Sequence, residues 1–192
     1  MSRSIDLLTT YLSDALALER HLYEAFDRQA NDSAVRACPQ AKGVVDRLHT
    51  TAKMHIDALD GHLRALGGRS TSTVKEAVTT VLGMAAGMLD KVRTYPAAKM
   101  LRDDYTALSM GAISYTMLHT TALALKELPT AQLARQHLQD YTPLIVEISE
   151  AMPFIVVQEL GDDALVVDAN VATEALRNTH SAWTRESVDR AA

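Results

Sequence analysis

The sequence predicts an all-α protein, a four-helix bundle made of two antiparallel helical hairpins. Apolar residues recur every three or four positions along several long segments, which is the period of a helix buried on one face. Alternation typical of β-strands is missing before about residue 160. The 192 residues are 47% apolar with only 8 Gly and 5 Pro, a composition typical of a compact chain with few loops. We expect a single domain over 1–192, with the helical bundle at 4–160 and a helical C-terminal extension at 161–192.

The first helix is predicted from Ile5 to Phe26, where apolar side chains form one continuous face. Ser4 stands directly before this segment. We expect it to cap the helix, because its hydroxyl can accept a hydrogen bond from a free backbone N–H. The polar residues at 31–33 are expected to form the exit turn.

The second helix is expected to begin at the Cys-Pro pair at 38–39, because proline is tolerated at the first helical position, and to end at the Gly pair at 67–68. It would then contain about 28 residues and extend roughly 42 Å, a length typical of bundles. A shorter helix should link the two hairpins. Thr73 and Glu76 have the spacing of a capping box, and the apolar stripe that follows ends before Pro96.

The fourth and fifth helices are predicted to form the second hairpin. Pro96 opens the fourth, which is expected to run to Leu128, and Thr130 is expected to cap the fifth. Pro143 lies within the fifth helix, where it removes one backbone hydrogen bond and should produce a kink.

Two further groups of residues, one acidic and one apolar, have positions that the helical pattern predicts. Glu147, Glu150 and Glu159 lie off the apolar face of the fifth helix and are expected to be solvated. In the extension, Leu176 and Trp183 are seven positions apart on one helical face. This apolar strip is expected to pack against the bundle or against a second subunit.

Charge and cysteine content restrict the partners and the cellular compartment that we expect for the protein. The formal net charge is 19 − 24 = −5, so there is no basic excess for nucleic acid or an anionic membrane surface, and we expect neither as a partner. No run approaches the roughly 18 apolar residues of a membrane span. The single Cys38 cannot form an intramolecular disulfide, and the N-terminus lacks the apolar core of a signal peptide. These features predict a cytoplasmic protein.

Polar residues interrupt the apolar faces of the first two helices. Glu19 lies among apolar neighbours, and burial of an unpaired carboxylate costs several kcal/mol, so it needs a partner. His55 and His62 lie on the apolar face of the second helix in the same way. A turn near residues 30–38 sets position 19 level with about 50–55. Glu19 and His55 should therefore meet, whereas His62 should lie more than one turn away.

Two interpretations of this pair stay open. It can be a buried hydrogen-bonded pair that fixes helix register, or part of a metal site, because carboxylate and imidazole on facing helices are ligands of first-row metals. On the fourth helix, His119 should lie level with 139–140, so Asp140 or His137 could approach it. The metal candidates are therefore Glu19, His55, His119 and Asp140. We expect no cofactor, with a single iron or zinc ion as the alternative.

Three segments resemble the ferritin-like superfamily, in particular its bacterial YciF-like stress-protein branch. They are ALALERHLYEAF around Glu19, HIDALDGHLRALGG, and LRDDYTALSMGAISYTMLHTTALALKEL. The similarity covers most of residues 5–150 and consists mainly of helix lengths, the Gly after the second helix and the Arg-Asp opening of the fourth. The resemblance implies a ferritin-like bundle.

The resemblance also implies where a di-iron centre would lie, and this sequence departs from that pattern. Such a centre uses a Glu on each of two helices and Glu-x-x-His on each of the other two. Glu19 and His55 match two of these positions, but Ala52 stands where the motif of His55 needs Glu. The matching region of the fourth helix, 114–117, has no carboxylate. On the fifth helix, Asp140 is followed three residues later by proline.

Three functions are therefore open. The first is a ferritin-like protein without the di-iron centre, a non-catalytic stress-associated or accessory binding protein that forms a homodimer and has an unknown protein partner or small ligand. The second is a metal-binding protein or oxidase with a reduced site around Glu19 and His55. The third is a small-molecule binder that uses the vacated bundle core. The residues expected to line that pocket are Ala52, Tyr115, Met117 and Tyr141.

Overall fold

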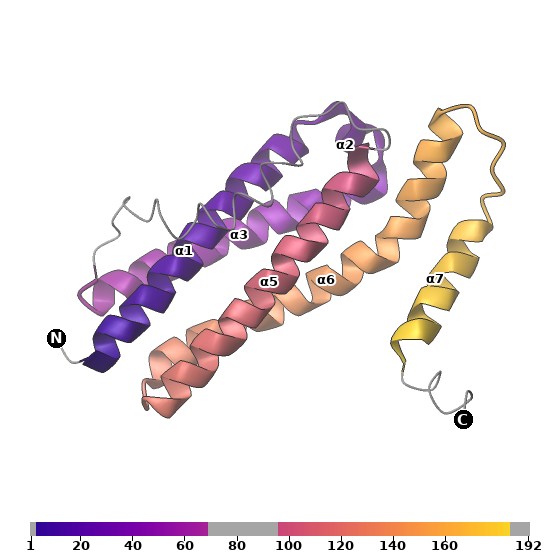
Figure 1. Cartoon of the computed structure of the whole chain (residues 1–192). Helices are drawn as coiled ribbons and strands as arrows, with labels where there is room; N and C mark the ends of the chain where they lie inside the picture. Colours follow the sequence, from indigo (N-terminus) through magenta and orange to yellow (C-terminus); the bar gives the residue numbers. More distant parts are fainter. Residues whose placement is uncertain (1–2, 69–95, 185–192) are drawn as a thin grey trace, which may run out of the picture.

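The computed structural model describes residues 3–68 and 96–184, and the regular elements in these ranges are all helices. They are α1 (Arg3–Ala30), α2 (Ser33–Ala37), α3 (Pro39–Ala65), α5 (Pro96–Ala124), α6 (Leu128–Asp162) and α7 (Val171–Trp183) (Figure 1). The all-α prediction is confirmed for this part of the chain. The linking helix expected from Thr73 lies outside the described residues. Among the described helices, none combines the length and the hydropathy of a membrane-spanning segment.

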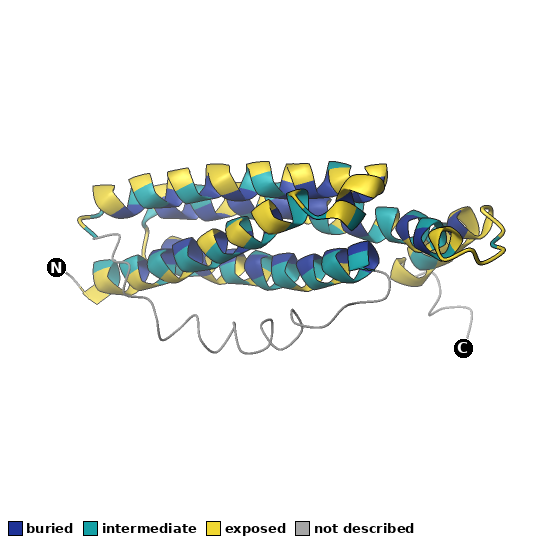
Figure 2. Cartoon of the chain, turned by 90° about the horizontal axis from the view of Figure 1, so that it is seen from above, coloured by how far each residue is buried: buried dark blue, intermediate teal, exposed yellow. Residues whose placement is uncertain are grey.

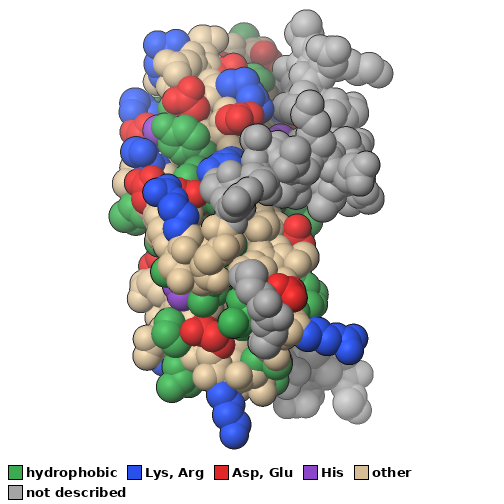
Figure 3. Space-filling model, turned by 90° about the vertical axis from the view of Figure 1, so that its left-hand side faces the viewer, with side chains coloured by type: hydrophobic (Ala, Val, Ile, Leu, Met, Phe, Trp, Pro, Cys, Tyr) green, Lys and Arg blue, Asp and Glu red, His purple; other side chains and the backbone are tan. Residues whose placement is uncertain are grey.

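The long helices α1, α3, α5 and α6 form a bundle (Figure 1). α1 packs along α3 and α5 along α6, while further contacts join α3 to α6 and α1 to α5. Buried residues follow the inward sides of these helices, and exposed residues follow the outward sides (Figure 2). On the outer face drawn in Figure 3, acidic and basic side chains are interspersed among small hydrophobic groups. The arrangement buries the apolar stripes, whose removal from water is the main stabilising contribution.

Local sequence sets several helix ends. α3 begins at Pro39, as expected, because the N–H that proline lacks has no intrahelical partner at a first position. It ends at Ala65, just before Gly67, whose φ of 76° is a left-handed conformation that glycine adopts without strain. Ser4 does not cap the first helix. It lies inside α1, which begins at Arg3.

Glu127, rather than Thr130, caps the N-terminus of α6. The Glu127 carboxylate accepts a hydrogen bond from the backbone N–H of Thr130 at 2.7 Å, and α6 begins at Leu128. Thr130 is therefore already helical and buried, and its Oγ1 lies 2.7 Å from His62 Nε2. The expected Thr130 cap is wrong, because the longer glutamate side chain reaches the free N–H from outside the helix. α5 ends at Ala124, earlier than the expected Leu128.

α6 continues through both of its prolines, Pro143 and Pro153, to Asp162. Each proline removes one intrahelical hydrogen bond. Ile148 and Ile155 of the same helix are buried, so this part of α6 still packs in the core. Figure 1 shows that α6 bends along its length. The C-terminal extension contains one helix, α7, which packs against α6. Residues 163–170 of the expected helical extension are not helical, and residues 185–192 lie outside the described part of the chain.

Glu159 differs from its expected solvated position. It is only 9% exposed, and its carboxylate accepts hydrogen bonds from the backbone N–H groups of Ala97, at 2.7 Å, and Ala98, at 3.3 Å. These groups lie in the first turn of α5, where N–H groups lack intrahelical partners and the helix dipole favours a negative charge. Glu147 and Glu150 lie toward solvent as expected, with side-chain exposures of 33% and 47%.

A buried amide and carboxyl connect α1 to α5. Asp104 is 4% exposed, and its Oδ1 accepts a hydrogen bond from Gln29 Nε2 at 2.8 Å. Asp104 Oδ2 and Gln29 Oε1 have no hydrogen-bond partner among the described residues. Burial raises the pKa of Asp104 to about 7; the Gln29 hydrogen bond opposes this rise and the charge of Asp103 adds to it. The folded state therefore favours the protonated carboxyl, which can donate to a neighbouring acceptor.

Asp104 should make the protein less stable at higher pH. Because its folded pKa, about 7, lies above the ordinary value of 3.8, the stabilisation is complete below the ordinary value and is lost as pH rises through the folded pKa. From pH 5 to pH 8 this group should lower the free energy of unfolding by on the order of 2 kcal/mol. Asp104→Asn should remove that part of the dependence in urea unfolding. Asp57→Asn, at a side chain 71% exposed, is the control. Equal pH dependence in wild type and Asp104→Asn would contradict the assignment.

Candidate metal centre

Glu19 lies at the centre of a polar cluster in the middle of the bundle. Its side chain on α1 is fully buried. Oε1 accepts a hydrogen bond from the Tyr115 hydroxyl of α5 at 2.5 Å and lies 3.0 Å from His55 Nδ1 of α3. Oε2 accepts from the Tyr141 hydroxyl of α6 at 2.6 Å. One carboxylate therefore contacts polar groups from the three other long helices, which satisfies the expectation that a buried charge needs partners.

His55 contacts carboxylates on both sides of its ring. Nδ1 faces Glu19, and Nε2 lies 3.1 Å from Asp140 Oδ2. The other oxygen of Asp140 accepts a hydrogen bond from Gln136 Nε2 at 2.9 Å. A neutral imidazole has one N–H and can donate only one of its two bonds. One of the two contacts therefore needs a further proton or a cation.

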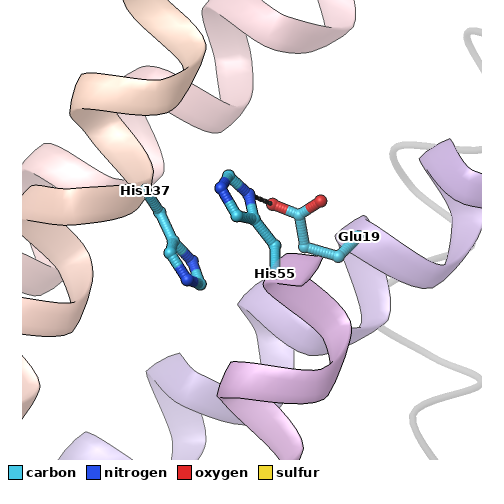
Figure 4. A group of neighbouring side chains, drawn as sticks. All are labelled: Glu19, His55 and His137. Carbon is cyan, nitrogen blue, oxygen red and sulfur yellow. Dashed lines mark hydrogen bonds and ion pairs between the residues drawn. The ribbon is translucent and has the colours of Figure 1, made fainter. Parts of the chain in front are cut away.

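His137 of α6 stacks on His55 with ring centroids 3.7 Å apart and planes 8° from parallel (Figure 4). Its ring is 2% exposed, and Nδ1 has no hydrogen-bond partner among the described residues. Burial lowers the pKa of His137 to about 3, and the charge of His55 adds to this effect. His137 is therefore neutral at physiological pH and keeps the lone pair that a metal ligand needs.

Glu19, His55 and His137 together form a candidate metal centre. Each offers one ligand atom, these atoms lie within 4.8 Å of one another, and all three residues are buried. Two imidazoles and a carboxylate are a donor set that suits zinc and iron(II), with further positions left for water or another ligand. Figure 4 shows His55 and Glu19 meeting from neighbouring helices, with His137 approaching from α6.

The two tyrosines position the carboxylate. Burial raises the pKa of both Tyr115 and Tyr141 well above 10, and the nearby charge of Glu19 adds to the rise, so both remain hydroxyl donors. Gly111 makes room for Tyr141: a Cβ at this position would lie 2.6 Å from the Tyr141 ring. Donors that orient a ligating carboxylate from outside are a common feature of metal sites.

Three of the four predicted metal ligands lie together in the structure, and His119 does not. Glu19 and His55 meet, as expected from the register of their helices, and Asp140 joins them through His55 rather than through His119. His119 lies elsewhere, with Nδ1 2.7 Å from the carbonyl oxygen of Ala131. The sequence interpretation placed His137 only beside His119. Its spacing from Tyr141, four residues on, places both on the same helical face and could have indicated the correct position.

The four residues expected to line a vacated core do not surround one space. Ala52, Tyr115 and Tyr141 are buried, but the two tyrosine hydroxyls point at Glu19 and occupy the position between the helices. Met117 is 54% exposed. Residues 115 and 117 are two apart, which turns their side chains to opposite sides of a helix. The pocket expected from these four residues is therefore wrong as a set.

Removing the central acceptor should destabilise the bundle. In the presence of a chelator, Glu19→Leu should lower the free energy of unfolding by roughly 2 to 4 kcal/mol, because two tyrosine hydroxyls and His55 lose their buried acceptor. Adding His55→Leu should recover part of this loss, since the unpaired imidazole is removed as well. Urea unfolding of both single variants and the double variant measures the effect. A double variant no more stable than the worse single variant would show that the two side chains do not depend on each other.

Comparison with known proteins supports the fold and assigns no family. No family model matches the chain, and no curated protein matches it. Among solved structures, it is similar to the protein XCC3681 from Xanthomonas campestris pv. campestris str. ATCC 33913, with a TM-score of 0.69 and 22% sequence identity. The similarity covers 85% of this chain and 100% of that chain. At this identity the likeness shows a shared helical fold alone.

Proposed function

We propose that this protein binds one divalent transition metal ion, iron or zinc, within a ferritin-like bundle and does not carry a di-iron centre. The observation that carries the proposal is the buried His137, whose Nδ1 has no partner among the described residues although it lies beside Glu19 and His55. A buried polar atom without a partner costs free energy unless something binds it. A cation held by these three side chains would satisfy it.

The contacts between helices support the two-hairpin arrangement of a ferritin-like bundle. Arg20 of α1 pairs with Asp60 of α3 at 3.8 Å, and Asp27 pairs with His49 at 3.4 Å. Positions rise along α1 while their partners fall along α3, a pattern that supports an antiparallel pair. α5 and α6 are joined by a short turn and contact each other extensively. These features agree with the resemblance seen in the sequence.

The donor set favours one ion over two. A second iron needs further bridging carboxylates, and the position preceding His55 by one helical turn is Ala52, which is buried and carries no ligand. Asp140 is occupied by His55 Nε2 and Gln136. In that role Asp140 fixes the ring of His55 and makes Nδ1 the ligating nitrogen, the outer contact typical of metal-bound histidine.

A second candidate is a purely structural polar core in an accessory binding protein. The specific observation in its favour is that both oxygens of Glu19 already have hydrogen-bonding partners on other helices. In this case His55 bridges Glu19 and Asp140 without a metal ion. A stress-associated role and a homodimer come from the sequence resemblance and belong to either candidate.

Cobalt(II) binding tests the proposal, because its visible absorption reports the ligands directly. The chelator-treated chain should bind one Co²⁺ per molecule. His137→Leu should weaken binding by about 100-fold or more, since even outer partners of metal ligands contribute 10- to 100-fold. His119→Leu removes a histidine of the neighbouring helix that lies outside the cluster, and it should bind Co²⁺ like wild type. Binding that survives His137→Leu, or no saturable binding, would favour the structural core. Two tightly held irons per chain would contradict the single-ion site.

A further inference from the structure

A pocket of about 590 Å³ lies between the C-terminal helix α7 and the bundle helices α5 and α6. α7 runs beside the end of α6 (Figure 1) and packs against it, yet Ala172 is its only buried residue. The helix is therefore held over the bundle with a hollow beneath it. The volume lies within the range of pockets that take small organic molecules.

Contacts at several points hold α7 in place. Ala172, near its start, is 2% exposed and lines the pocket. His180 Nε2 lies 3.2 Å from Glu150 Oε1 of α6, and the ring of Trp183 meets Tyr105 of α5 edge-on, with centroids 6.4 Å apart. α7 therefore contacts both bundle helices of the pocket and encloses it on a third side.

The described residues that line the pocket are mostly apolar and include one basic side chain. α6 contributes a continuous apolar surface that includes Ile148, Met152 and Val157, and Trp183 of α7 is 57% exposed beside it. Among the described residues that line the pocket, Arg102 is the only charged one. Its Nε and one terminal nitrogen donate to Asp103 Oδ1 at 3.0 and 2.7 Å. A guanidinium has five N–H donors, so others are left for an anionic oxygen.

We propose that this pocket binds a small amphiphile with an apolar body and a single anionic head group, such as a medium-chain carboxylate. The apolar wall of α6 would hold the body, and Arg102 would bind the head group. A flat apolar face would suit a second protein chain better, but this surface is concave and α7 of the same chain already covers it. The site is separate from the metal centre, so either can be correct without the other.

Two dyes with nearly the same aromatic body test the two halves of the proposal. 8-Anilino-1-naphthalenesulfonate carries the anionic group, and N-phenyl-1-naphthylamine lacks it. Both should bind at one site per chain, quench the single Trp183 and be displaced by decanoate. Arg102→Gln should weaken the sulfonate dye about tenfold or more and leave the neutral dye unchanged, because only the former loses a charge-assisted bond. Arg177→Gln, on α7 outside the lining, is the matched control.

A second pair of variants tests the location. Val157→Phe should fill the pocket and weaken both dyes about tenfold, whereas Val146→Phe, on the exposed side of α6, should change neither. Dye binding unaffected by Val157→Phe would overturn the site, and equal effects of Arg102→Gln on both dyes would overturn the anionic head group. A wild-type dimer that binds no dye, and that Val157→Phe converts to monomer, would assign the pocket to a second copy of the chain and overturn the proposal.

Discussion

The hydrogen bonds of the buried Glu19 carboxylate are the interactions on which the arrangement of the bundle depends. The carboxylate carries partners from α3, α5 and α6, so all four long helices are joined at one level through a single side chain on α1. Apolar packing is non-directional and tolerates sliding of one helix along another. A carboxylate that is removed from water opposes such sliding, because the loss of one hydrogen-bond donor leaves its charge uncompensated. The cluster thereby selects one register of the helices from those that apolar packing would allow.

The same constraint creates the chemistry of the site. Two carboxylates contact one imidazole, and the stacked His137 is kept neutral by burial. The two carboxylates favour a cation beside the imidazole, and the proposed metal ion would supply one. The tyrosines keep their protons and hold Glu19 with or without that ion. The structural and metal-binding interpretations therefore describe one arrangement of side chains without and with a bound ion.

α7 contributes no side chain to the Glu19 cluster. The buried cores of α1, α3, α5 and α6 meet one another, whereas α7 adds one buried residue and leaves Trp183 largely exposed. Its amphipathic sequence provides more apolar surface than the contact with α6 covers. This excess, together with the concave surface between α5 and α6, places the proposed amphiphile pocket at the end of the bundle, away from the polar cluster in its middle.

The sequence by itself determined the helical class, the starts at Pro39 and Pro96, and the approach of Glu19 to His55, because helical period, proline geometry and the position of one turn are local properties. It did not determine the stacking of His137 on His55, the pairing of Asp140 with His55, or the burial of Glu159 over the start of α5. Those contacts depend on how far each helix is rotated about its axis and how α6 bends. Rotation by one residue is about 100° and moves a side chain from solvent to core, and only the packing of all four helices decides it.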